Sequence, residues 1–147
     1  MKQLLLSLLM CLMIVTLVLG LSSCNKTKED STLRLFTHLS TDESSRVQKA
    51  LGYSLNQLNL GVKLFVWLDC KGVRVADSTI PEFHNFQTIL TNLVNGGATV
   101  MVCPLGMMQN DVNEINLVEG MWVGGSNCIP EMNEKYLFKS NTAYLSW

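Results

Sequence analysis

Residues 61–70 read GVKLFVWLDC, and the run Val62–Leu68 within them decides the fold class. A nearly continuous series of β-branched and aromatic side chains is typical of a strand that is buried on both faces of a parallel sheet. The run ends at Asp69 and Cys70, so polar and reactive side chains follow it directly. We therefore predict a central parallel strand here, with candidate functional groups at its carboxyl end.

Helical patterns lie on both sides of this strand. Upstream, residues 40–43 (STDE) have the form of a capping box, apolar residues at helical spacing follow over 47–58, and Gly61 ends the helix. Downstream, a second capping box at 79–82 (TIPE) precedes an apolar stripe over 83–94, and Gly96-Gly97 end that helix. The pattern predicts one crossover helix before the central strand and one after it.

Four further segments have strand character, and two more are expected to be helical. The strands are predicted at 33–37, 98–102, 121–123 and 143–147, and the helices at 110–118 and around 130–138. Strands that alternate with helices indicate βαβ units with right-handed crossovers. The expected fold is α/β, with a mainly parallel sheet of about five strands covered by helices on both faces.

The N-terminal segment is predicted to be a targeting signal rather than part of the folded domain. Lys2 precedes the apolar stretch Leu4–Leu19, and the quartet Leu21-Ser22-Ser23-Cys24 resembles the lipobox of bacterial lipoproteins. The resemblance implies a signal peptide over 1–23, a lipid on Cys24, a polar tether over 24–31 and a domain over 32–147. An uncleaved membrane anchor or plain secretion is the alternative. Each reading places the domain outside the cytoplasm, and the lipid anchor places it in the cell envelope, on the periplasmic or cell-surface face of a membrane.

Charge and composition exclude several classes of function. After position 24 the chain carries ten Lys and Arg against twelve Asp and Glu, without a basic cluster, which argues against a nucleic-acid partner. Two histidines make a histidine-based metal site improbable, and the cysteine spacing contains no C-x-x-C pattern for zinc. The glycine pairs match no phosphate-binding motif. We expect no metal and no cofactor.

Ligands of open parallel sheets bind outside the carboxyl ends of the strands, so the residues at those ends are the candidate site. They are His38, Asp69, Cys70, Lys71, Arg74, Cys103 and Cys128. A cysteine is nucleophilic as its thiolate, and Lys71 or Arg74 could lower a thiol pKa. The alternatives are that the cysteines are buried apolar residues, or that Cys70 and Cys103 form a disulfide.

Several segments together resemble the DsrE/DsrF-like, or sulfur-relay, family. They are LRLFTH at 33–38, residues 61–76 with Gly72-Val73, GATVMVC at 97–103, LVEGMWVG at 117–124 and LSW at 145–147. The resemblance covers about 32–147. It implies a three-layer α/β/α sandwich in which Cys103 carries sulfur as a persulfide. It also implies a homo-oligomer or a relay partner protein.

Two hypotheses follow from the residues and the resemblance. In the first, a membrane-tethered, extracytoplasmic domain handles sulfur through Cys103, with Cys70 as resolving thiol and His38, Asp69, Lys71 and Arg74 as binding residues. In the second, the chain is a non-enzymatic lipoprotein that binds a small ligand or a partner protein in a cleft at the strand ends. The first predicts a reactive Cys103, and the second predicts inert or bridged thiols.

Overall fold

A computed structural model describes residues 32–125 and 141–147. Within them, parallel strands form one five-stranded sheet in the order β4-β3-β2-β1-β5. The strands are β1 (Arg34–Leu39), β2 (Lys63–Leu68), β3 (Thr99–Val102), β4 (Trp122–Val123) and β5 (Thr142–Ser146). The predicted α/β class and parallel sheet are confirmed, and the apolar run at 62–68 is a central strand.

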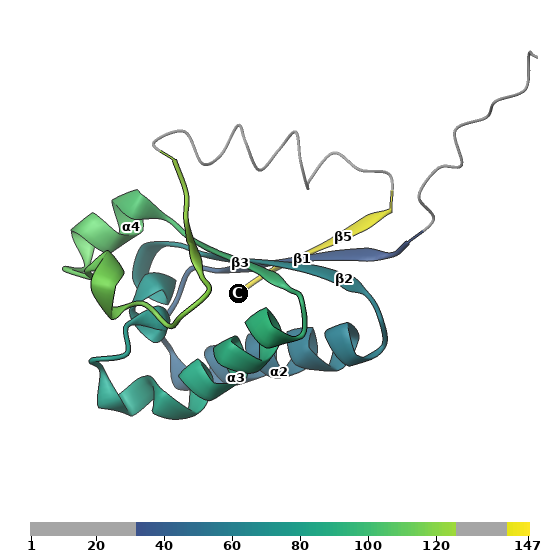
Figure 1. The fold of residues 1–147 in the computed structure, drawn as a ribbon, viewed down its shortest axis with the longest axis horizontal. Helices are drawn as coiled ribbons and strands as arrows, with labels where there is room; N and C mark the ends of the chain where they lie inside the picture. Colours follow the sequence, from purple (N-terminus) through teal and green to yellow (C-terminus); the bar gives the residue numbers. More distant parts are fainter. Residues whose placement is uncertain (1–31, 126–140) are drawn as a thin grey trace, which may run out of the picture. The chain divides into compact units, whose positions relative to one another are not determined.

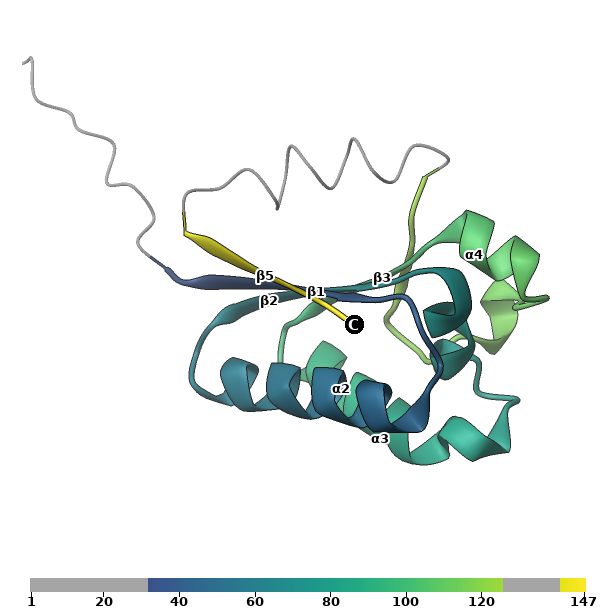
Figure 2. The same cartoon turned by 180° about the vertical axis from the view of Figure 1, so that it is seen from behind.

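Two long helices connect the central strands. Helix α2 (Ser44–Asn59) links β1 to β2, and helix α3 (His84–Asn95) links β2 to β3. Figures 1 and 2 show both helices on the same face of the sheet. Gly61 and Gly97, which follow them, have φ angles of 83° and 90°, a region that favours glycine, so these residues end the helices as predicted.

Shorter helices gather at the carboxyl ends of the strands. The 3₁₀ helix η1 (Cys70–Ala76) follows β2, and η2 (Pro81–Phe83) leads into α3. Helix α4 (Pro104–Gln109) follows β3, and η3 (Glu114–Asn116) comes before β4. Short helices and the turns between them therefore surround the predicted functional edge of the sheet (Figure 1).

The main core lies between the sheet and the two long helices. Alternate strand residues such as Leu35, Val66 and Val102 are buried against Leu51 of α2 and Leu90 of α3. Full burial of one such side chain stabilises the fold by about 1.5–3 kcal/mol. One polar pair lies in this core, since the hydroxyls of Thr37 and Ser54 are 2.9 Å apart and both residues are fully buried.

The opposite face of the sheet is aromatic. Phe36, Phe65, Trp67, Met101 and Cys103 form a second buried cluster there. The rings of Phe36 and Phe65 stack with centroids 5.1 Å apart. The cysteine at the end of β3 thus belongs to an apolar cluster distinct from the main core.

Neither predicted capping box caps a helix. Glu43 is the N-cap of α2 and makes no side-chain cap bond, while the Ser40 hydroxyl donates to the Trp147 carbonyl oxygen at 2.9 Å. The Thr79 hydroxyl donates to Asp77 Oδ1 at 2.6 Å, which closes a turn before η2. Short hydroxyl side chains bond to other groups as readily as to helix ends, and here one bonds to a distant carbonyl oxygen and the other within a turn.

The predicted helix over 110–118 is wrong. The helix in this region is α4, which starts earlier because Pro104 occupies its first position, where a missing N–H costs nothing. Asn110 ends α4, and Asp111 has a φ of 55°, which interrupts any continuation. The helix predicted around 130–138 lies outside the described residues.

Within the described parts of the chain, no helix is both long enough and apolar enough to cross a membrane.

Candidate functional site at the carboxyl ends of the strands

One row of side chains crosses the aromatic face of the sheet near its carboxyl edge. Adjacent strands place Ser146, His38, Trp67, Met101 and Trp122 in register, in that order across the sheet. Residues in register on parallel strands share a face, so these side chains are neighbours. Asp69 and Cys103 come directly after this row, at the ends of β2 and β3.

His38 is held by contacts on three sides. Its ring stacks on that of Trp67, with centroids 4.7 Å apart and planes at 21°. Its Nδ1 lies 3.2 Å from the Tyr144 hydroxyl and 3.3 Å from the Ser146 hydroxyl. Its Nε2 lies 3.6 Å from Asp69 Oδ2. The structure thus brings together His38 and Asp69, two candidates that the sequence placed on different strand ends.

Cys103 is fixed at the end of β3 by the sheet itself. Its backbone N–H donates to the Leu68 carbonyl oxygen at 2.9 Å, which extends the β2–β3 ladder by one bond. It is the N-cap residue of α4, and its side chain, 5% exposed, packs in the aromatic cluster with Trp67 and Met101. The sulfur is therefore sheltered and lies on the same face as His38.

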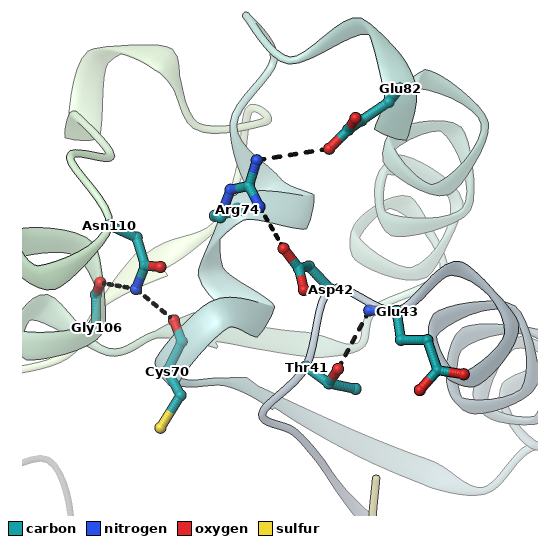
Figure 3. Close-up of polar contacts among 8 residues, drawn as sticks. All are labelled: Thr41, Asp42, Glu43, Cys70, Arg74, Glu82, Gly106 and Asn110. Atoms are coloured by element: carbon teal, nitrogen blue, oxygen red, sulfur yellow. Dashed lines mark hydrogen bonds and ion pairs between the residues drawn. The ribbon is translucent and has the colours of Figure 1, made fainter.

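Cys70 is exposed, and its backbone is held in a rare conformation. Its φ is 46°, and its N–H donates to Asp69 Oδ1 at 2.6 Å. Figure 3 shows its carbonyl oxygen, which accepts from Asn110 Nδ2 at 2.9 Å. Partial desolvation raises the pKa of the Cys70 thiol, and the charge of Asp69 and a hydrogen bond to it raise it further. The expected lowering of a thiol pKa by cations is therefore not found at Cys70.

The two candidate cations do not form a thiolate site at Cys70. Arg74 makes ion pairs with Asp42 and with Glu82, the latter at 3.5 Å. Figure 3 shows its guanidinium directed toward these carboxylates and away from the Cys70 sulfur. Lys71 is exposed. Arg74 thus ties η1 to the segments that precede α2 and α3, rather than activating a cysteine.

Cys70 and Cys103 are not joined by a disulfide, because Cys70 carries a free thiol. No group of metal-ligating side chains occurs within residues 32–125 and 141–147. Cys24 and Cys128 lie outside the described residues.

Trp67, Tyr144 and Ser146 belong to the site, and the sequence analysis did not single them out. Their positions follow from strand alternation, because residues two apart on a strand share a face, but the β1–β5 register could not be read from the sequence. Trp67 also has a specific signature. Its Nε1 is buried and has no hydrogen-bond acceptor among the described residues. Nε2 of His38 is likewise buried and has no hydrogen-bond partner among them.

A pocket of about 540 Å³ lies at the other edge of the sheet, by the amino ends of β1, β2 and β3. Its described lining includes Arg34, Lys63, Phe65 and Thr99, and contains no cysteine or histidine. This pocket is separate from the row that holds His38 and Trp67. The described cysteines lie at the carboxyl edge of the sheet, away from this pocket.

Comparisons with known proteins identify the fold. No protein-family model matches the chain, and no curated protein matches it. Among solved structures, it is similar to MTH1491 from Methanobacterium thermoautotrophicum, a protein of unknown function, with a TM-score of 0.63 and 19% identity over 78% of this chain and 99% of that one. YchN from E. coli gives a TM-score of 0.64 and 14% identity, over 78% and 99% of the two chains.

BT1422 from Bacteroides thetaiotaomicron, also a protein of unknown function, gives a TM-score of 0.53 and 21% identity, over 77% of this chain and 94% of that one. At these identities the likeness establishes the fold and not the chemistry. The chain has the DsrE-like α/β fold.

Proposed function

We propose that this protein is a sulfur carrier in which Cys103 accepts a sulfane sulfur and holds it as a persulfide. The observation that carries the proposal is the position of Cys103. It directly follows the interior strand β3 at the edge where parallel sheets bind ligands, and it is sheltered beside Trp67 and Met101 on the face that also holds the His38–Asp69 pair. The DsrE-like fold supports the same assignment.

The chemistry needs no cofactor. The Cys103 thiolate attacks the sulfane sulfur of a donor such as inorganic polysulfide, so that a new S–S bond forms while a donor S–S bond breaks. The shortened polysulfide leaves with the electron pair of the broken bond. In the second half, an acceptor thiolate attacks the outer sulfur, and Cys103 leaves as a thiolate. The sulfur is transferred without net oxidation or reduction of the protein.

Burial of Cys103 suits a carrier. A persulfide in bulk solvent is open to attack by any passing thiol, whereas one in the aromatic cluster is sheltered by the side chains packed around Cys103. His38 and Asp69 flank that edge and are proposed to contact the donor and the acceptor. Cys70 has a raised pKa and stays protonated near neutral pH, so we assign it the later, resolving role rather than the first attack. In that role the Cys70 thiolate attacks the outer sulfur of the persulfide, and Cys103 leaves as a thiolate.

The test is a count of labile sulfur on each variant. The protein is incubated with polysulfide, freed of excess reagent and treated with cyanide, and the thiocyanate released is measured per chain. Wild type should release sulfur, Cys103→Ser should release almost none, and the matched variant Cys70→Ser should load like wild type. Equal release from wild type and Cys103→Ser would reject the proposal.

We further propose that the domain is tethered to a membrane through a lipid on Cys24 and passes sulfur to a partner protein or to a second copy of itself. The support is the lipobox-like quartet that ends in Cys24. Cys24→Ala should abolish incorporation of a labelled fatty acid into the chain in a bacterial host. Cys11→Ala, a cysteine change inside the apolar stretch, is the matched control and should leave the incorporation unchanged.

A second candidate function is binding of a small molecule, and the pocket of about 540 Å³ at the amino edge of the sheet favours it. That volume lies within the range of ligand sites. Because its described lining holds no cysteine, ligands found by thermal-shift screening should stabilise wild type and Cys103→Ser equally. A screen without any stabilising compound would count against this function.

A further inference from the structure

Trp67 carries an unused hydrogen-bond donor in the interior of the site. Its side chain is 8% exposed, and none of the described residues accepts a hydrogen bond from its Nε1. Buried indole N–H groups are ordinarily paired. An unpaired one at a candidate site therefore indicates an acceptor that arrives with the ligand.

The ring that carries this donor is held in place. It stacks on His38 and meets Phe36 in a tilted contact with centroids 6.4 Å apart. On the other side, Trp67 is in register with Met101, and Cys103 is the next residue of that strand line on the same face. The donor and the sulfur thus belong to one buried cluster, and neither ring contact uses the N–H.

We propose that the indole N–H of Trp67 donates a hydrogen bond to the outer sulfur of the persulfide on Cys103. This inference rests on the proposed function and adds the residue that stabilises the loaded form. The outer sulfur of a persulfide carries negative charge, which an apolar cluster disfavours. A donor already fixed in that cluster offsets the cost and supplies the acceptor that the indole lacks.

Trp147 provides a matched comparison. Its Nε1 is also buried without an acceptor among the described residues, but its side chain packs against the main core, on the face of the sheet away from Cys103. It should therefore be indifferent to the state of Cys103. Two tryptophans with the same unpaired group, one beside the sulfur and one away from it, separate a specific role from a general packing effect.

The first experiment leaves the protein unmodified. The indole N–H signals of its three tryptophans are recorded by NMR before and after loading with polysulfide, and assigned by Trp122→Phe and Trp147→Phe. The Trp67 proton should move downfield on loading, while that of Trp147 should stay. A Trp67 signal that does not move, in protein whose Cys103 carries sulfur, would overturn the inference and leave the carrier function intact.

The second experiment measures loading. Trp67→Phe keeps a ring in the cluster but removes the N–H, so the polysulfide concentration that half-loads Cys103 should rise about tenfold, the loss expected for one hydrogen bond to a charged group. Trp147→Phe should load like wild type. Equal loading of the two variants would refute the role of Trp67, whereas failure of wild type to load would refute the carrier function itself.

Discussion

Gly72 sits where the 3₁₀ turn after β2 touches the end of β1, and replacing it with alanine should be costly. A Cβ at this position would lie 2.8 Å from the carbonyl carbon of Leu39 and closer still to the carbonyl oxygen of Leu39. It would also lie 3.4 Å from the Leu39 Cγ. The Leu39 carbonyl oxygen accepts a hydrogen bond from the Asp69 N–H at 3.0 Å, and the Gly72 N–H donates to the backbone carbonyl oxygen of Asp69 at 2.7 Å. Backbone therefore blocks the new methyl group, and no flexible side chain can move aside.

The magnitude follows from these contacts. Overpacking against fixed structure costs about 1–3 kcal/mol, and displacing the Asp69–Leu39 hydrogen bond adds about 1 kcal/mol. We expect Gly72→Ala to lower the free energy of unfolding by about 2–4 kcal/mol. Gly52→Ala is the matched control, because its Cβ would meet only Gln48 Nε2, at 3.6 Å, inside helix α2. That substitution should stabilise the protein by about 0.5–1 kcal/mol.

Urea unfolding followed by circular dichroism measures both variants against wild type. The reasoning predicts shifts of opposite sign from one and the same chemical change. A Gly72→Ala midpoint at or above that of wild type would refute the close approach of η1 to β1, and with it the placement of Asp69 and Cys70.

Three further substitutions test other parts of the account. Asp69→Asn removes a charge that raises the pKa of Cys70, so the midpoint of Cys70 alkylation against pH should move to lower pH; an unchanged midpoint would contradict that cause. Thr37→Val should cost about 1–3 kcal/mol in urea unfolding by leaving the Ser54 hydroxyl buried and unpaired, whereas the double variant with Ser54→Ala should cost less than Thr37→Val alone. Arg74→Met should lower stability by no more than about 1 kcal/mol, because its ion pairs are partly exposed. It should also leave cyanide-releasable sulfur on Cys103 unchanged, and a loss of that sulfur would show that Arg74 serves the thiol after all.

Hydrophobic periodicity predicted the sheet and its two long helices because both depend on burial patterns that are local in the chain. The run at 62–68 and the stripe over 83–94 were each placed correctly within a few residues. The helix caps were not predicted correctly, because the hydroxyls of Ser40 and Thr79 bond to groups other than the N–H groups at the helix starts. The Ser40 hydroxyl, for example, donates to the carbonyl oxygen of Trp147, at the far end of the sequence.

The sequence predicted that the candidate residues lie at the carboxyl edge of the sheet, but it predicted only part of their contacts. Asp69 and Cys103 directly follow strands, and His38 lies next to the last residue of β1, so topology alone gathers them at one edge. The direction of a long side chain could not be predicted from the sequence. Arg74 stands close to Cys70 in sequence, yet two carboxylates from other segments bind it. Tyr144 and Trp67 reach His38 through register between strands, which sequence spacing does not reveal.

The central claim is that Cys103 is the residue that receives sulfur. The most direct measurement is tandem mass spectrometry of the whole protein after exposure to polysulfide and a persulfide-trapping alkylating reagent, followed by digestion. The account predicts one additional sulfur on the peptide that contains Cys103, appearing before any on the peptide that contains Cys70. A Cys103 peptide that is alkylated without extra sulfur, while Cys70 carries it, would contradict the account.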